Sequence, residues 1–302
     1  MLCPYCNCPD SFPSFLPSTI FNEKIFRYVT CSDCDVIYIN PLPDANDYFK
    51  MYPPEYQSGV NRTILKNQYK KLPGLRFSYG FQFDLIKKYA THDPKILDYG
   101  CGNANFLINA LDKDFICDGA EFNEKHVEIL KEEIPSCNFY TITDFLKDST
   151  VKYDVIRLSN VLEHMDNPSE IIRLLINRLA NNGILLIEGP LECNFNFAYL
   201  TRKVYFLLMN KIRNGYIANH APTHITFTNY KNQLSFFNKL GLKTLEYKIN
   251  EAAWPYPASF AEALGLGGKV KVIIARFSIL FSGFSKEWGN TFIYVGRKEQ
   301  EN

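Results

Sequence analysis

The sequence predicts an α/β fold in which helices cover both faces of a mostly parallel sheet. Between residues 95 and 190, short apolar runs alternate with segments of helical length, and crossover helices of that kind join parallel strands. Two more apolar runs follow later, and five cysteines crowd into the first 34 residues. We therefore expect a seven-stranded sheet preceded by a small, ribbon-like metal-binding module.

Seven apolar runs of strand length carry this prediction. They are residues 96–99, 115–120, 137–140, 155–158, 184–187, 242–249 and 291–295. An amphipathic helix is expected over about 76–90, before the first run, and a mostly helical segment over 259–284, before the last.

Composition divides the chain into three parts. Residues 1–43 hold the crowded cysteines and two β-like runs, 25–30 and 36–39, which predict a hairpin. Prolines at the end of this region mark a boundary. Residues 44–75 are polar and aromatic and are predicted to be a connector, and residues 76–302 form the main domain.

The charge balance and the first residues bear on partners and location. Lys and Arg number 33 against 32 Asp and Glu, so no strong field attracts a polyanion, and nucleic acid is not an expected partner. The start lacks the basic segment and apolar run of a secretory signal, and no uncharged stretch reaches about 18 residues. We expect a soluble, cytoplasmic protein without an obligate protein partner.

The cysteine spacing predicts a structural zinc site. Cys3 and Cys6 form one two-residue knuckle, Cys31 and Cys34 form another, and 24 residues separate the two. Four thiolates suit tetrahedral Zn²⁺ and leave no open position for chemistry. The first pair alone resembles a glutaredoxin-type redox pair, but no strand fits before residue 3. Cys8 stays open as an alternative ligand to Cys6.

A glycine-containing turn after the run 96–99 predicts a cofactor site. Gly100 and Gly102 allow a ligand to lie against the backbone, and the helix that follows offers unpaired N–H groups. A dinucleotide fingerprint would need glycine where this chain has Asn105. Glu121, at the end of the next predicted strand, can accept hydrogen bonds from both hydroxyls of a ribose. These features predict a ligand with a nucleoside-like shape.

From about residue 95 to residue 247 the sequence resembles class I S-adenosylmethionine-dependent methyltransferases, which have a Rossmann-like domain. The resemblance rests on the turn at 98–102 and on the segments near 121, 144, 153 and 159. It implies that Glu121 binds ribose, that Phe122 packs on adenine, and that Asp144 and Phe145 meet the adenine edge. The implied cofactor-binding residues are Asp98, Gly100, Cys101, Gly102, Glu121, Phe122, Asp144, Phe145, Ser159 and Asn160. Ala104 departs from the family, in which glycine is common there.

The N-terminal region resembles the zinc-binding region that precedes several sugar-modifying methyltransferases. Both cysteine pairs, residues 26–27 and residues 39–41 carry this resemblance, while Asp35 replaces the usual glycine. It implies S-adenosylmethionine and structural Zn²⁺ as cofactors. It also implies a sugar, a sugar nucleotide or a glycan intermediate of polysaccharide biosynthesis as acceptor, with O-methylation favoured. The large C-terminal domain of the sugar C-methyltransferases has no counterpart in this sequence, so their particular reaction is not expected.

His164 and His224 are the candidate catalytic residues. His164 follows the fourth strand of the main domain, where it either accepts a proton from the acceptor or packs beneath the cofactor. His224 lies in the segment 219–227, which resembles the family's acceptor-facing loop. His220 and His224 are four residues apart, but Pro222 disfavours a helical metal-binding pair.

Two apolar and basic segments leave the acceptor open. Residues 195–213 either cover a phosphorylated or lipid-linked sugar as a lid or form an amphipathic helix packed on its own domain. Lys271 and Arg276 interrupt the segment 270–284, so it is no membrane span, while peripheral contact with a membrane surface stays open. The alternative functions are an RNA methyltransferase whose zinc module grips nucleic acid and a non-catalytic S-adenosylmethionine-binding protein.

Overall fold

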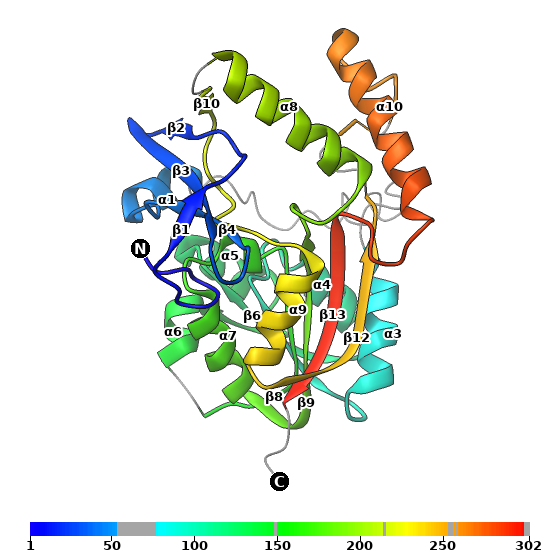
Figure 1. Ribbon diagram of the computed structural model, residues 1–302. Coiled ribbons are helices and arrows are strands. Elements are labelled where there is room, and N and C mark those ends of the chain that lie inside the picture. Colours follow the sequence, from blue (N-terminus) through cyan, green and yellow to red (C-terminus); the bar gives the residue numbers. More distant parts are fainter. Residues whose placement is uncertain (53–76, 148–149, 214–215, 253–255, 258, 299–302) are drawn as a thin grey trace.

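A computed structural model describes the chain except for residues 53–76, 148–149, 214–215, 253–255, 258 and 299–302. Its central layer is the predicted seven-stranded sheet, with strand order β12-β13-β9-β8-β5-β6-β7 (Figure 1). The strands are β5 (Lys95–Tyr99), β6 (Ile116–Glu121), β7 (Asn138–Thr141), β8 (Tyr153–Ser159), β9 (Leu179–Pro190), β12 (Leu242–Asn250) and β13 (Thr291–Lys298). β13 runs antiparallel to both of its neighbours, and the other pairs are parallel. The predicted mostly parallel α/β sheet is confirmed.

Helices cover both faces of this sheet. One face packs on α3 (Tyr79–Tyr89), α4 (Asn105–Leu111) and α5 (Glu124–Glu133), and the other packs on α6 (Ile142–Lys147), α7 (Pro168–Asn177) and α9 (Tyr230–Lys239). Alternate strand residues divide between two apolar clusters, with Ile96 in one and Leu97 in the other. Burial on both faces explains why the central strands, such as β8 and β9, are largely apolar runs in the sequence.

Side-chain caps fix where several helices begin. Ser78 accepts a hydrogen bond from the N–H of Phe81, so the helix predicted over about 76–90 occupies 79–89. Asn123 caps α5 through the N–H of His126, and Asn167 caps α7 through the N–H of Glu170. α5 follows the carboxyl end of β6 and α7 follows that of β8, so the caps of these two helices also set loops at the edge of the sheet that carries the site.

A second, smaller sheet contains the N-terminal region. Its strands are β1 (Ser11–Pro13), β2 (Thr19–Phe21), β3 (Lys24–Cys31), β4 (Ile37–Asn40), β10 (Ala218–Asn219) and β11 (Thr226–Phe227). The antiparallel pairing of β3 with β4 confirms the predicted hairpin. β10 and β11 come from the main domain and extend this sheet at its two ends. The N-terminal region and the main domain therefore share one sheet.

Further contacts fix the N-terminal region on the main domain. Tyr5 packs on Phe236 of α9 with ring centroids 4.3 Å apart, and Ser169 of α7 donates a hydrogen bond to the carbonyl of Pro4. The helix α1 (Ala45–Met51) follows β4 and begins with an Asp44–Asp47 capping box. Most of the predicted connector lies outside the described residues.

Two long helices stand apart from the sheet, above the carboxyl ends of its parallel strands (Figure 1). They are α8 (Phe197–Arg213) and α10 (Gly265–Ser282), and they pack on each other. Among the residues of α8, Ala198 alone is buried, so this helix does not pack on the sheet along its length. In the described part of the chain, no helix combines the length and the apolar character that crossing a bilayer would require.

Candidate active site

The turn after β5 has backbone angles that favour glycine. Gly100 has φ +76° and Gly102 has φ +51°, and the N–H groups of Gly100 and Cys101 both donate to the carbonyl of Ala120. A Cβ atom on Gly100 would lie 2.4 Å from Cγ2 of Val161. The turn is therefore pressed against the segment that follows β8.

Ala104 also has positive φ, +54°, and it directly precedes α4. Its methyl group is fully buried, so it faces the protein interior. No side chain caps the first turn of α4, which leaves that turn without a side-chain acceptor for its N–H groups. Alanine in place of the family's glycine therefore adds some backbone strain. Its methyl group does not occupy the space for the ligand.

Glu121 is held against the glycine turn. Its carboxylate accepts hydrogen bonds from the N–H of Gly102 at 2.8 Å and of Phe122 at 2.7 Å. Oε1 also accepts from the N–H of Asn123 at 3.4 Å, whereas Oε2 accepts only from Gly102 among the described residues and keeps a second lone pair that suits a ribose hydroxyl. The ring of Phe122 is 63% exposed, as a surface for stacking on a base would be. Asn103 adds a buried Oδ1 without a hydrogen-bond partner among the described residues, so the loop fits the donor groups of an adenosyl amino acid.

A buried polar chain lies beneath this turn. Arg157 Nη1 donates to Asp98 at 2.6 Å, and Arg157 Nε donates to Gln82 at 2.7 Å. Gln82 in turn donates to Glu188 at 3.0 Å, and Ser159 donates to Glu188 at 2.5 Å. Burial raises the pKa of Asp98, although Arg157 opposes the shift. Asp98 and Ser159 thus have protein partners, and direct contact of either residue with a cofactor stays a prediction.

The other predicted cofactor residues are placed differently from one another. Cys101 is buried, and Phe145 is 2% exposed in the core beside Tyr99. The side chain of Asp144 is 67% exposed and accepts a hydrogen bond from Thr141. Asn160, with φ +53°, follows β8 and lines a cavity. The structure brings the glycine turn, Glu121, Phe122 and Asn160 to one edge of the sheet, and the roles of these residues stay predictions.

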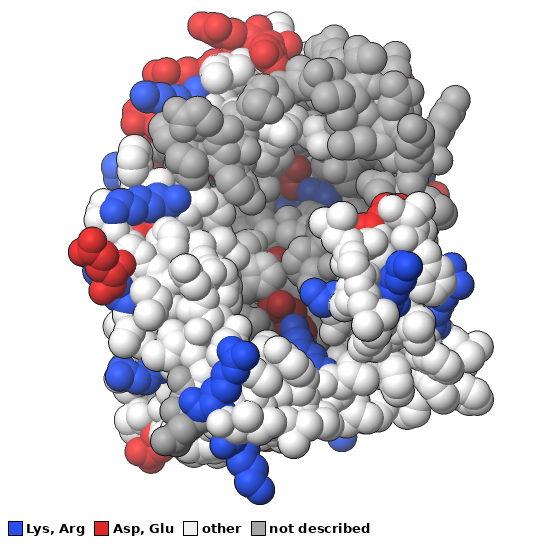
Figure 2. Space-filling view, turned by 90° about the horizontal axis from the view of Figure 1, so that it is seen from above, with Lys and Arg blue, Asp and Glu red and all other residues white. Residues whose placement is uncertain are grey.

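The cavity has a volume of about 470 Å³ and opens at the carboxyl ends of β8 and β9. Its lining includes Tyr52, Asn160, Glu163, His164, Glu192 and His224. Seen from above, this side of the molecule is hollowed, with acidic and basic side chains in the depth of the hollow (Figure 2). Sequence reasoning had singled out Asn160, His164 and His224, and it missed Tyr52, Glu163 and Glu192 as parts of the same cavity.

The two candidate histidines lie together in this cavity. Their ring centroids are 4.8 Å apart. His164 Nδ1 lies 2.7 Å from the carbonyl of Thr223 and 2.9 Å from the hydroxyl of Tyr52, and His224 Nδ1 lies 2.7 Å from Glu192 Oε2. A carbonyl and a carboxylate only accept, so Nδ1 is the donor in both rings.

Glu192 is the acidic partner of this pair. Burial by itself favours its neutral form, but the nearby His224 outweighs that effect and lowers the pKa of Glu192. His220, by contrast, lies against Thr19 at 3.3 Å and belongs to no metal-binding group among the described residues. The pairing of His164 with His224 thus takes the place of the His220–His224 pair considered from spacing.

The four predicted zinc ligands converge. The sulfur atoms of Cys3, Cys6, Cys31 and Cys34 all lie within 4.8 Å of one another, with Cys3–Cys34 at 3.6 Å and Cys6–Cys31 at 3.4 Å. A tetrahedron with Zn–S bonds of about 2.3 Å has S···S edges of about 3.8 Å, so the group fits Zn²⁺. A hydrogen bond from Cys34 lowers the pKa of Cys3 to about 5. Cys8 Sγ instead donates to the carbonyl of Asp10.

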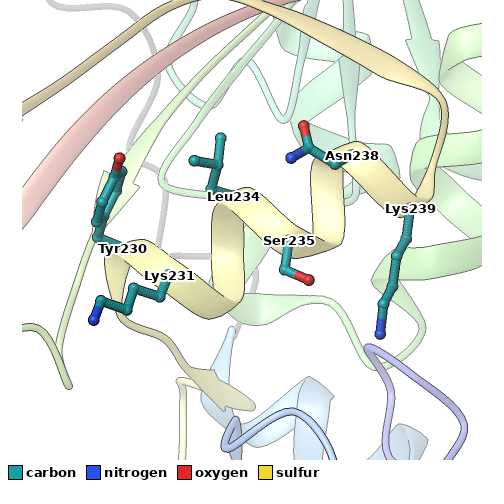
Figure 3. Close-up of a pocket in the computed structure, with 6 residues that line it drawn as sticks. All are labelled: Tyr230, Lys231, Leu234, Ser235, Asn238 and Lys239. Atoms are coloured by element: carbon teal, nitrogen blue, oxygen red, sulfur yellow. The ribbon is translucent and has the colours of Figure 1, made fainter.

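A second depression, of about 630 Å³, lies along α9. All of its lining residues belong to this one helix (Figure 3). They are Tyr230, Lys231, Leu234, Ser235, Asn238 and Lys239. None of them is acidic or a histidine, and the glycine turn and Glu121 lie on other elements. This surface offers no convergent reactive groups. The candidate active site is therefore the cavity lined by His164 and His224.

Comparison with known proteins agrees with this arrangement of turn, sheet and cavity. A family model described as a methyltransferase domain matches residues 52–247. The chain therefore belongs to the methyltransferase-domain family.

Two similar proteins illustrate the relationship. A ubiquinone biosynthesis O-methyltransferase from Glaesserella parasuis serovar 5 (strain SH0165) is 30% identical over 104 residues, which are 31% of this chain and 44% of that protein. The match thus spans less than half of that relative. A solved chain from the complex between the Haloferax volcanii Trm112 methyltransferase activator and the putative methyltransferase has a TM-score of 0.52 at 12% identity, covering 86% of this chain and 100% of that chain. This likeness supports the Rossmann-like methyltransferase fold.

Proposed function

We propose that the protein transfers a methyl group from S-adenosylmethionine to a hydroxyl group of a small molecule. The main support for this proposal is the position of Asn160, which follows β8 beside the glycine turn and also lines the cavity that contains both histidines. A donor at the turn and an acceptor in the cavity would therefore meet at this residue. S-adenosylmethionine, when bound, supplies an already activated methyl group.

The chain's own residues have two tasks in this reaction. Glu121 and Phe122 hold the adenosine portion, through the carboxylate and the exposed ring. His164 and His224 are the groups in the cavity that can activate the acceptor hydroxyl, since hydrogen bonds at Nδ1 fix both rings. The remaining rate enhancement comes from positioning the two reactants and excluding water, because the methyl donor needs no further activation.

A hydroxylated, sugar-like acceptor suits this cavity. Its lining is rich in amide, carboxylate and hydroxyl groups, among them Asn160, Glu192, Asn196 and Tyr199. These groups can pair with several hydroxyls of one ligand. We propose a sugar, a sugar nucleotide or a glycan intermediate as acceptor. The O-methyltransferase name of the Glaesserella relative supports oxygen as the methylated atom.

We propose further that the four-cysteine cluster holds a structural Zn²⁺. Two of the four thiols, Cys3 and Cys31, are fully buried, and all four sulfurs would be occupied by the ion. A closed set of four ligands stabilises the fold and leaves no position for substrate. The cluster thus supports the N-terminal region and takes no part in the reaction.

The test of the proposed function is calorimetric titration with S-adenosylmethionine, followed by a radiolabelled methyl-transfer assay with sugars and sugar nucleotides. The Glu121→Ala variant should lose at least tenfold in affinity. Glu128→Ala, on the exposed face of α5, is the matched control and should bind like the unaltered protein. Folded protein that binds no S-adenosylmethionine would overturn the proposal, and cofactor binding without transfer to any acceptor would favour a non-catalytic binding protein.

A further inference from the structure

Three side chains in the candidate active site form a group suited to a metal ion. Ligand atoms of Glu163, His164 and His224 all lie within 4.8 Å of one another. The group is separate from the four cysteines and contains no sulfur. We propose that it binds one divalent first-row transition-metal ion, of the class that includes Zn²⁺, Co²⁺ and Mn²⁺.

The orientation of both histidines supports this site. Each ring uses Nδ1–H as a donor, His164 to the carbonyl of Thr223 at 2.7 Å and His224 to Glu192 at 2.7 Å. In a neutral imidazole that tautomer leaves the lone pair on Nε2. A metal-binding histidine commonly has its other nitrogen bonded to a carbonyl or carboxylate in this way. Glu192 and Thr223 therefore act as positioning groups for two Nε2 ligands.

Glu163 supplies the third ligand and an independent observation. It is only 6% exposed, and its Oε2 is buried with no hydrogen-bond partner among the described residues. Its Oε1 lies 3.7 Å from His164 Nε2. A buried carboxylate oxygen without a donor is costly, and a cation held by both oxygens of this carboxylate together with the two imidazoles would satisfy it.

The ligand set also indicates what the ion would do. Two histidines and one carboxylate leave coordination positions open, as in catalytic and not structural sites. All three ligands line the cavity, so an open position faces the space for the acceptor. An acceptor hydroxyl bound to the ion would lose its proton more readily, to solvent water. With the ion bound, the two histidines would be ligands of the ion, and neither would accept this proton itself. This use of the ion rests on the proposed function, whereas binding of the ion does not.

The test uses full-length protein whose cysteine cluster is already filled with Zn²⁺, to which Co²⁺ is added. One Co²⁺ per chain should bind with the visible absorption of nitrogen and oxygen ligands and without thiolate charge transfer. Glu163→Gln and His224→Gln should each weaken Co²⁺ binding at least tenfold. Glu192→Gln should weaken it about 10- to 100-fold, as removal of a histidine's hydrogen-bond partner does. His220→Gln, four residues from His224 but outside the group, should bind like the unaltered protein.

Each outcome separates this inference from the methyltransferase proposal. Thermal melting and retained Zn²⁺ establish that a variant is folded. Folded protein that binds no Co²⁺, or Glu163→Gln that binds it unchanged, would overturn the metal site. If methyl transfer continued at an unchanged rate after the ion at Glu163, His164 and His224 was removed, the catalytic role of this ion would be overturned. Co²⁺ binding in protein that fails to bind S-adenosylmethionine would leave the metal site standing and overturn only the proposed function.

A different part of the molecule carries a second inference. The helices α8 and α10 expose large apolar side chains that nothing in the described structure covers. On α8 these include Val204, Tyr205, Leu207, Leu208 and Ile212, and on α10 they include Leu266, Phe277, Ile279 and Leu280. We infer that this pair of helices docks on the surface of an anionic lipid bilayer.

The positive charge of the two helices favours an anionic bilayer as their partner. The helix α8 carries four Lys or Arg residues, α10 carries three, and neither contains Asp or Glu, although the whole chain is nearly neutral. Arg202 faces the cavity and the carbonyl of Glu192, which leaves three basic residues on each helix. Apolar side chains together with such basic ones are the features of helices that lie in an anionic interface. Residues Ala198, Tyr199 and Arg202 of α8 also line the active-site cavity. An acceptor with a lipid tail would thus reach the cavity from the docked face.

Flotation of the full-length protein with phosphatidylcholine vesicles, with and without phosphatidylglycerol, tests the docking. Binding should require the anionic lipid and weaken with salt. Leu208→Asp and Leu280→Asp should each lower it at least tenfold, and Lys211→Ala should lower it about fivefold. Ile116→Asp, equally exposed but at the start of β6, should have no effect. Absence of binding to anionic vesicles would overturn the inference, as would a stable dimer in solution that Leu280→Asp dissociates.

Discussion

The guanidinium of Arg157 lies 2.6 Å from the carboxylate of Asp98, and neither side chain is more than 4% exposed. Removing one member of such a buried pair leaves the other without a countercharge. Arg157→Met should therefore lower the free energy of unfolding by about 3–5 kcal/mol, measured by urea denaturation. Lys88→Met is the control, because the lysine of the Lys88–Glu246 pair is exposed and its removal should lower the free energy of unfolding far less. Equal losses in the two variants would contradict the prediction.

The contact between Gly100 and Val161 gives a prediction about cofactor binding. In Gly100→Ala the added methyl group would overlap Val161 Cγ2, and positive φ would add about 1–2 kcal/mol of strain. We expect at least a tenfold loss of affinity for S-adenosylmethionine by calorimetry. The double variant Gly100→Ala/Val161→Ala should recover part of this loss, because the overlap is relieved while the backbone strain remains. No recovery would show that the overlap is not the cause.

Loss of the proposed Zn²⁺ should loosen the N-terminal region. Cys34→Ser removes one of the four converging thiols and should lower the zinc content and the thermal midpoint together. Cys8→Ser should change neither, because Cys8 Sγ lies against the carbonyl of Asp10 outside the cluster. Metal analysis and thermal unfolding of both variants check this. A zinc loss in Cys8→Ser as large as that in Cys34→Ser would make Cys8 a ligand.

The capping box of α1 predicts a dependence of stability on acid. Burial alone would raise the pKa of Asp47, but hydrogen bonds from Lys24 and Asn22 outweigh it and lower the pKa to about 2, from 3.8. A lowered pKa in the folded state means that the ionised carboxylate stabilises the protein above about pH 4, and that this contribution is lost as the pH falls toward 2.

The measurement compares denaturant unfolding of the unaltered protein and Asp47→Asn between pH 7 and pH 2. The difference in free energy of unfolding should be constant above about pH 4 and should shrink below it. A difference that does not change over this range would show that Asp47 does not titrate as described.

Local patterns in the sequence were sufficient for most of the fold. All seven strands of the main sheet lie at the predicted apolar runs. The central strands are buried on both faces and need apolar stretches, whereas the edge strand β12 is mostly half-buried and has polar residues between its apolar ones. The boundary of β9 differed, since this strand begins at Leu179 and includes the turn-like residues 181–183. The turn preference persists inside the strand, because residues 180–183 pair with neither β8 nor β13 and Asn182 has φ +64°, so they form an irregularity between Leu179 and Ile184.

Which residues come together in the candidate site was harder to predict from the sequence. Glu192 and His224 are 32 residues apart, and their contact depends on how the loop before β11 lies. That loop is set by two backbone bonds, from the N–H of Ile225 to the carbonyl of Glu163 and from the N–H of Ile39 to the carbonyl of Ile225. Neither bond leaves a pattern in the sequence, because backbone groups are the same at every residue. The short strands β10 and β11 escaped prediction for the same reason.

The sharing of strands between the two sheets has a consequence for how the protein is made. Thr19 of β2 meets Ala218 of β10 across 199 residues, so a nascent chain cannot complete its first sheet until most of it has left the ribosome. A fragment that ended near residue 43 would present two unpaired strand edges, which favour aggregation. The cysteine-rich region is thus not a portable domain that can be grafted elsewhere, and its folding is tied to that of residues 218–227.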